Sequence, residues 1–303
     1  MRGRVRTAAA ILVGALVLAA CGRLTGTGGD GSTGPTGGPR IEHPTGSDEL
    51  VLRVEQRGGF VPFEHTLTRV PSWSLYGDGR VIVEGPQIEI YPGPALPNLL
   101  VFRLTEEGVQ AVLEAARDAG LMDRDASYPN PCITDVPATV FTTTAEGRTT
   151  VVSADALGMG PSACPGVDDE ARAKLEAFWS KLTDLGSWLP EGSVGPEEPY
   201  VAAEIRIYVR PYRGEPDLAQ EPIAWPLETP LADLGAPFEG AGERMRCGVV
   251  SGADLETLRP LLERANQLTP WESGGKRYGL LFRPLLPDEH GCETPLPSVG
   301  RSS

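Results

Sequence analysis

The sequence predicts an α+β protein with two domains, each a small, mostly antiparallel sheet packed by one or two helices, after a disordered tether. Three observations lead to this prediction. Apolar residues alternate with polar ones in several short segments, which is typical of half-buried strands. Two longer segments have the helical spacing of apolar residues and begin at capping residues. A polar, Pro-rich stretch at 190–199 divides the chain into two parts of ordinary domain size.

The first 20 residues have the composition of a secretory signal peptide. Three arginines precede Thr7–Ala20, fourteen uncharged residues. Fourteen residues are too few to span a bilayer, because a spanning helix needs about 20. The tetrapeptide that ends at Cys21, Leu-Ala-Ala-Cys, resembles the lipobox of bacterial lipoproteins. The resemblance implies a cut before Cys21, acylation of its thiol with fatty acids such as palmitate, and anchoring on the extracytoplasmic face of the cell membrane. A plain signal peptide with an incidental cysteine is the alternative.

Residues 21–47 are expected to be the acylated cysteine and a flexible tether. Of the 26 residues after Cys21, nine are Gly and seven are Ser or Thr. Such a segment forms no apolar face that could offset the entropy lost on ordering. An O-glycosylated segment is compatible with the same residues.

Residues 48–189 are expected to form the first domain. Thr105 and Asp168 are predicted helix caps, and Gly120 and Gly186 are predicted helix ends. The Pro-rich stretch 86–97 is predicted to be a loop. The predicted strands are 50–54, 73–76, 80–83, 99–104, 138–144 and 148–153.

After the linker at 190–199, residues 200–293 are expected to form the second domain and residues 294–303 a disordered tail. The clearest strand is 201–209, and 244–250 and 278–283 are two more. Ser251 is a predicted cap for a helix that Pro260 should kink. Both halves place a strand before a capped helix and another strand after it, so a diverged duplication is an open interpretation.

The charge of the chain limits its partners. Without residues 1–20, which contain three of the 27 basic residues and none of the 41 acidic ones, the formal charge falls from −14 to −17. Such an acidic surface disfavours binding to nucleic acid or to anionic lipid headgroups. Membrane attachment is therefore expected only through the lipid on Cys21, and the partner is an unidentified protein or cell-wall component.

Four cysteines remain after Cys21, and in an exported protein an even number favours disulfides. Three pairings are possible. The predicted hairpin at 138–153 brings its flanking loops to one end, which favours Cys132–Cys164, and the linker then leaves Cys247–Cys292 in the second domain. A zinc site is the alternative, but the sequence has no CxxC pair and no histidine cluster.

Candidate metal and catalytic residues are few. Asp123 and Asp125 begin a loop like that of an EF-hand, but Tyr128 stands where Gly is needed, so calcium binding with Asp135 stays open beside simple turn capping. No GxSxG, HExxH or phosphate-binding loop is present. A triad built on His65 is the remaining catalytic alternative. We predict no enzyme activity, no catalytic residues, no metal and no cofactor.

Aromatic residues in loops give the best indication of a binding surface. Tyr91 lies in a Pro-Gly-Pro segment, and Trp225 precedes a proline in the long loop of the second domain. Exposed aromatic rings on loops suit contact with a partner or a glycan. The alternative is that these rings fold back to cover the sheets.

Three short segments of the first half resemble an uncharacterised bacterial lipoprotein domain over roughly residues 50–189. They are Ser74–Val81, Leu104–Glu107 and Thr134–Pro137. Gly58-Gly59-Phe60 is also faintly similar to a segment of emfourin-type inhibitors of metalloproteases. We therefore expect an extracytoplasmic binding or scaffolding module without catalysis. A protease inhibitor of the cell envelope is the first alternative, and a cell-envelope hydrolase is the second.

Overall fold

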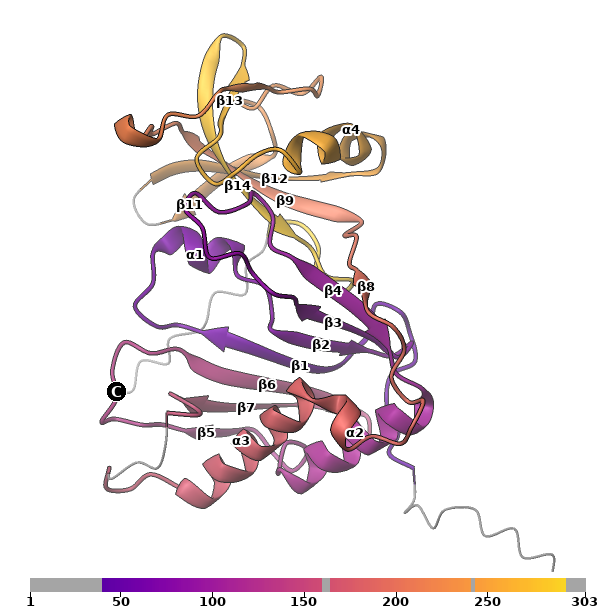
Figure 1. The fold of residues 1–303 in the computed structure, drawn as a ribbon. Helices are drawn as coiled ribbons and strands as arrows, with labels where there is room; N and C mark the ends of the chain where they lie inside the picture. Colours follow the sequence, from indigo (N-terminus) through magenta and orange to yellow (C-terminus); the bar gives the residue numbers. More distant parts are fainter. Residues whose placement is uncertain (1–39, 160–163, 241–242, 293–303) are drawn as a thin grey trace, which may run out of the picture. The chain divides into compact units, whose positions relative to one another are not determined.

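The computed structural model describes residues 40–159, 164–240 and 243–292 (Figure 1). These residues form an α+β fold with four α-helices and two sheets of mostly antiparallel strands, so the predicted fold class is confirmed. The predicted signal peptide, Cys21 with most of the predicted tether, and the tail at 294–303 lie outside the described residues.

The first sheet contains eight strands in the order β5-β7-β6-β1-β2-β3-β4-β8, all antiparallel except β5 beside β7. Its strands are β1 (Leu50–Arg57), β2 (Trp73–Tyr76), β3 (Arg80–Glu84), β4 (Leu99–Arg103), β5 (Ala126–Tyr128), β6 (Ala138–Ala145), β7 (Arg148–Asp155) and β8 (Glu198–Pro199). Both predicted hairpins, β2–β3 and β6–β7, are present. The first needs Gly79 at its turn, because φ is 81° there and a Cβ would lie 2.6 Å from the carbonyl oxygen of Leu104.

Helices α2 (Glu106–Asp118) and α3 (Asp169–Thr183) cover one face of this sheet (Figure 1). Both begin at the predicted caps, where Thr105 accepts a hydrogen bond from the amide of Gly108 at 3.3 Å and Asp168 accepts one from the amide of Ala171 at 3.0 Å. Helix α3 ends before Gly186, because a short 3-10 turn, η1 (Leu185–Ser187), follows it.

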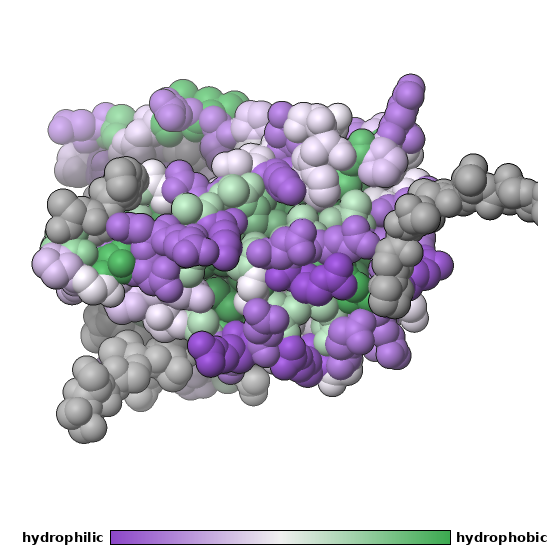
Figure 2. All heavy atoms as spheres, turned by 90° about the horizontal axis from the view of Figure 1, so that it is seen from below, coloured by the Kyte–Doolittle hydropathy of each residue, from purple (hydrophilic) through white to green (hydrophobic). Residues whose placement is uncertain are grey.

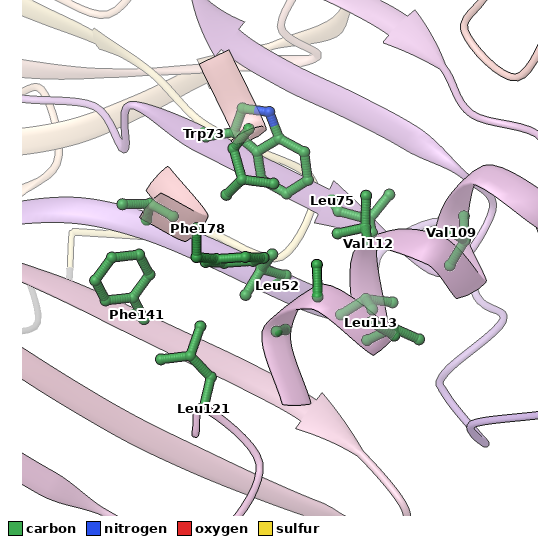
Figure 3. Packing of buried hydrophobic residues seen from close by; sticks show 14 of the residues in the cluster. Leu52, Trp73, Leu75, Val109, Val112, Leu113, Leu121, Phe141 and Phe178 are labelled. Carbon is green, nitrogen blue, oxygen red and sulfur yellow. The ribbon is translucent and has the colours of Figure 1, made fainter. Parts of the chain in front are cut away.

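The apolar stripes of these helices meet the apolar face of the sheet in one core (Figure 3). Phe141 of β6 and Phe178 of α3 lie with their ring centroids 6.1 Å apart. Burying each large side chain of this kind stabilises the fold by about 1.5–3 kcal/mol. Figure 2 shows the molecule from below the view of Figure 1, and hydrophilic residues with hydrophobic ones between them make up that face.

The second sheet contains six strands in the order β10-β13-β14-β9-β12-β11, all antiparallel except β10 beside β13. Its strands are β9 (Glu204–Pro211), β10 (Ile223–Ala224), β11 (Ala236–Gly240), β12 (Glu243–Ser251), β13 (Pro270–Ser273) and β14 (Lys276–Pro284), and η2 (Pro216–Leu218) is a 3-10 turn. Helix α4 (Gly252–Leu262) packs on this sheet around Trp271. The predicted side-chain cap is absent, because the hydroxyl of Ser251 makes no capping hydrogen bond.

Strand β9 is buried on both faces, which its alternating pattern did not predict. Arg206 and Tyr208, on the polar side of the pattern, have exposed fractions of only 2% and 0%. Tyr208 packs in one cluster with Leu67 of a helix that the sequence did not reveal, α1 (Phe63–Thr68) from the first half. Arg206 donates to the carbonyl of Gly291, in the segment after β14. The strand also begins at Glu204 and leaves Val201 exposed.

The predicted tether at 21–47 is too long at its C-terminal end. Ile41 is 3% exposed and lies in the first core, and its amide donates to Gln110 of α2 at 2.8 Å. His43 lies 3.2 Å from Glu106 at the start of the same helix. The burial of Ile41 and these contacts with α2 hold this segment against the first core. Residues 40–47 therefore belong to the folded part of the chain.

The segment predicted as a linker lies along the first sheet. Glu198–Pro199 pairs with β4, Ser193 is 2% exposed, and the amide of Gly195 donates to Arg103 at 2.8 Å. The two sheets still divide the chain near this segment. Their separate folding as domains stays a prediction.

Both favoured disulfides are present. Cys132–Cys164 and Cys247–Cys292 close segments with sequence separations of 32 and 45 residues. The second bridge attaches the segment after β14 to β12, and the carbonyl of Gly291 accepts a hydrogen bond from Arg206 of β9 at 2.7 Å. The same segment also contacts the first half of the chain, because Leu286 packs against Tyr76 and Ile82 of the first sheet.

Candidate functional site

A cleft of about 950 Å³ lies where the first and second halves meet. One wall comes from α1, the residues after it, and the ends of β1 and β3. The other wall comes from the loop at 86–97, strand β14 and residues 210–215. This volume is within the range of sites for small ligands. Figure 1 shows how the loop between β3 and β4 extends from the first sheet to the second.

Charged side chains of α1 form the polar wall. Glu64 accepts an ion-pair hydrogen bond from Arg210 of β9 at 2.7 Å. Arg69, directly after the helix, donates to the carbonyl oxygens of Gln56 at 3.0 Å and Gly58 at 3.3 Å. Its own carbonyl accepts a hydrogen bond from Arg283 of β14 at 3.0 Å. These contacts hold α1 between the two sheets.

The loop at 86–97 forms the apolar wall. Ile88, Ile90 and Tyr91 line the cleft with exposed fractions of 66%, 60% and 61%. The loop contains a cis peptide bond between Tyr91 and Pro92. Large exposed side chains that gather in one cavity indicate a binding surface more strongly than scattered ones.

Hydrogen bonds to the second half hold this loop in place. The amide of Ala95 donates to the carbonyl of Ala265 at 3.2 Å, and the amide of Gln267 donates to the carbonyl of Gly93 at 2.9 Å. The hydroxyl of Tyr91 donates to the carboxylate of Glu215. The apolar wall is therefore formed before any ligand arrives, which lowers the ordering cost of binding.

Two titratable groups in the cleft are perturbed. Glu84 ends β3, and burial within the concave wall raises its pKa, although the positive charge of Arg69 opposes this rise. The side chain still reaches water, so the effect reflects the lost part of its hydration shell. Burial and then the charge of Arg69 lower the pKa of His65. His65 is therefore predominantly neutral at pH 7.

The two aromatic residues that were predicted to form a binding surface lie in different environments, one exposed and one buried. Tyr91 is exposed and lines the cleft. Trp225 does not contribute to a surface: its exposed fraction is 9%, and its ring packs edge-on against Trp271 in the second core. The ring folds back onto the sheet, and its Nε1 donates to the carbonyl of Thr229 at 2.9 Å. The predicted lipidation residue, Cys21, lies outside the described residues.

Two of the three candidate calcium residues, Asp125 and Asp135, have partners within the fold. Asp125 accepts a hydrogen bond from the amide of Val151 at 2.8 Å, and Asp135 lies 3.4 Å from the hydroxyl of Thr134. Among the residues that the structure describes, no three His, Cys, Asp or Glu side chains gather as a metal site would require. No helix in the same ranges is long and apolar enough to cross a membrane.

The sequence did not reveal Glu84, Arg69, Ile88 and Ile90 as residues of one site. One signal was available for the isoleucines: two β-branched residues stand inside a stretch of Pro, Gly, Gln and Glu that cannot form a core strand. No local signal connects Glu84 to Arg210, because they come from different sheets.

No family model, no curated protein and no solved structure matches this chain.

Proposed function

We propose that this protein is a lipid-anchored, extracytoplasmic binding module without catalysis, and that the cleft between its two sheets is the ligand site. The observation that carries this proposal is the set of three exposed apolar side chains, Ile88, Ile90 and Tyr91, on a wall of a cavity of about 950 Å³. Water-exposed apolar groups that are already held in a concave site favour an apolar ligand, because binding removes their surface from water without a folding cost.

The ligand site can be tested with Nile red, a neutral apolar dye whose fluorescence rises when it leaves water. The described residues from Arg40 onward form one compact unit, so the chain from Gly22 to Ser303 contains the whole cleft. We expect saturable binding to this chain and, in Ile88→Asp, on the order of tenfold weaker binding.

Val201→Asp is the matched control for this experiment. Val201 has the same exposed fraction as Ile88, 66%, and does not line the cleft. Equal loss in both variants would assign the dye to scattered apolar surface and would contradict the proposed site.

The anchoring part of the proposal rests on the lipobox at Cys21 and has its own test. Cys21→Ser should leave the precursor uncleaved or release the protein from the membrane fraction, while the disulfide-bonded fold from Arg40 onward stays intact. Identical fractionation and migration of the variant and the unaltered protein would remove the lipid anchor from the proposal.

One observation favours protease inhibition as a second candidate. Phe60 is 87% exposed at the tip of a turn in which Gly58 and Gly59 have φ values of 70° and 84°. The amide of Phe60 donates to the carbonyl of Asp135 at 3.0 Å, which holds the turn in one conformation. A rigid loop with a protruding aromatic ring suits an apolar specificity pocket of a protease.

Inhibition of a zinc metalloprotease that cleaves beside large apolar residues tests this candidate. We expect inhibition by the unaltered chain and its loss in Phe60→Asp, with Met159→Asp as a control at another exposed apolar residue (58%). No inhibition, or inhibition unaffected by Phe60→Asp, would exclude this function for the turn.

A further inference from the structure

The charged side chains that line the cleft balance one another. Its lining contains as many glutamates as arginines: Glu64, Glu84, Glu215, Arg69, Arg210 and Arg213. Glu64 of α1 and Arg210 of β9 form an ion pair at 2.7 Å. Glu215 accepts a hydrogen bond from the hydroxyl of Tyr91, and Arg213 has interactions of its own.

Arg69 and Glu84 also act on each other. Burial raises the pKa of Glu84 and lowers that of Arg69, and the attraction between the two charges opposes both shifts. The Nη1 of Arg69 donates in addition to the carbonyl oxygens of Gln56 and Gly58. An ion that enters this cleft therefore loses part of its hydration without meeting an unpaired counter-charge, which makes its binding costly.

Neutral polar groups of the cleft are available, in contrast to the charged ones. Within the described ranges, no hydrogen bond reaches the hydroxyl of Ser72, the imidazole of His65 or the side-chain nitrogen of Gln267, which all line the cleft. The Gln267 amide is held in place, because its Oε1 accepts a hydrogen bond from the amide of Gly93 at 3.3 Å. Such groups can bond a hydroxyl, an amide or an ester, none of which carries a charge.

The apolar wall accompanies these neutral groups. Ile88, Ile90 and Tyr91 expose apolar surface in the cleft, and Leu96 and Phe282 add to the lining from the loop and from β14. We propose, on the basis of the proposed function, that the cleft selects an uncharged amphipathic ligand: an apolar chain that carries a hydroxyl, amide or ester group. The apolar chain supplies most of the affinity, and the neutral polar group sets the orientation of the ligand.

Displacement of Nile red by three eight-carbon probes tests the inference. Octan-1-ol, octylammonium and octanoate share the apolar chain and differ in charge. At pH 8 and about 0.15 M salt, which screens the net charge of the protein, octan-1-ol should displace the dye at a concentration on the order of tenfold lower than either ion. Calorimetric titration of octan-1-ol gives its affinity without the dye.

Breaking the ion pair between Glu64 and Arg210 should change the preference in a defined direction. Arg210→Gln leaves the carboxylate of Glu64 unpaired, so octylammonium should displace the dye at a concentration on the order of tenfold lower than from the unaltered chain. Glu64→Gln leaves the guanidinium of Arg210 unpaired and should favour octanoate in the same way. The double variant Glu64→Gln/Arg210→Gln has balanced charges again and should restore the preference for octan-1-ol.

Glu272→Gln is the matched control, because it breaks an ion pair with Arg277, at 3.0 Å, outside the cleft lining. It should leave the displacement by all three probes unchanged, and circular dichroism checks that each variant is folded. Displacement by either ion at the same or a lower concentration than octan-1-ol, or equal effects of Arg210→Gln and Glu272→Gln, would overturn the neutral preference while leaving the ligand site intact. Absence of binding of both the dye and octan-1-ol would overturn the ligand site itself.

Discussion

Arg53 of β1 donates to Asp288 at 2.7 Å, although 235 residues separate them in the sequence. The hydroxyl of Tyr76 donates to the same carboxylate oxygen at 2.8 Å. The side chains of Arg53 and Asp288 are only 11% and 21% exposed. This ion pair fixes the segment after β14 to the first sheet, and so it holds together the two halves that form the cleft.

Replacement of Asp288 should destabilise the protein strongly. Asp288→Ala leaves the Arg53 guanidinium in a buried site without its counter-charge and takes the acceptor from Tyr76. We expect the free energy of unfolding to fall by about 3 kcal/mol, at the lower end of the range for a broken buried pair. Urea unfolding measures this change.

Glu170→Ala is the control for Asp288→Ala, because its pair with Lys174 at 2.9 Å is exposed to water and is expected to add little. If both variants unfold at the same urea concentration as the unaltered protein, the contact between Arg53 and Asp288 does not hold the halves together.

Tyr200 should make the stability depend on pH in the alkaline range. Its hydroxyl donates to the carbonyl of Leu285 at 2.9 Å, and burial is the main reason that its pKa rises to about 12. Arg80 lowers this pKa, and Glu289 and Asp288 raise it. The neutral phenol is favoured in the folded state, so its contribution is complete below the unfolded pKa of about 10 and is lost as the pH rises to about 12.

Absorbance at 295 nm, which reports ionised tyrosine, tests the Tyr200 prediction. The difference between the unaltered protein and Tyr200→Phe should titrate with a midpoint near 12. A midpoint near 10, with the protein still folded, would show that Tyr200 is exposed to water.

The disulfide between Cys247 and Cys292 should add more to the free energy of unfolding than the local contacts of the two cysteines do. It closes a segment with a sequence separation of 45 residues, and the residues just before Cys292 carry Asp288 and the acceptor for Arg206. We expect the double variant Cys247→Ser/Cys292→Ser to lose roughly 3–4 kcal/mol in urea unfolding. Cys132→Ser/Cys164→Ser, with a separation of 32, should lose slightly less.

Peptide mapping without reductant checks the pairing that underlies this comparison. A peptide that joins Cys132 to Cys247 would contradict both the disulfides and the separation of the two sheets. Unchanged stability in both double variants would mean that the cores alone hold the segments in place.

Much of the fold could be predicted from the sequence because its signals are local. The hydroxyl of Thr105 caps α2 by accepting a hydrogen bond three residues further on, and Gly79 allows the tight turn that connects β2 to β3. An amphipathic stripe such as that of α3 identifies its buried face without information about the rest of the chain. These elements therefore lie close to their predicted positions.

The remaining features depend on contacts between distant residues. Tyr208 is fully buried because Leu67 of the short helix α1 covers it, and six residues carry too weak a periodic signal to identify that helix. Trp225 belongs to the second core because its ring packs against the ring of Trp271, 46 residues further along the chain. The cleft is lined by Glu84 of the first sheet and by Arg210 and Leu280 of the second. Local periodicity contains no information about which residues of the two sheets lie close together.

Trp225 and Tyr91 should respond in opposite ways to truncation, since one is a core residue and the other lines the cleft. Trp225→Ala removes a side chain that is 9% exposed and lies with its ring centroid 5.8 Å from that of Trp271. We expect a loss of about 3–5 kcal/mol of unfolding free energy. Tyr91→Ala removes a ring that is 61% exposed, so stability should stay unchanged while Nile red binding weakens. Urea unfolding and dye titration of both variants are the measurements. Weaker dye binding in folded Trp225→Ala together with unaltered binding in Tyr91→Ala would move the ligand site from the cleft to the second core.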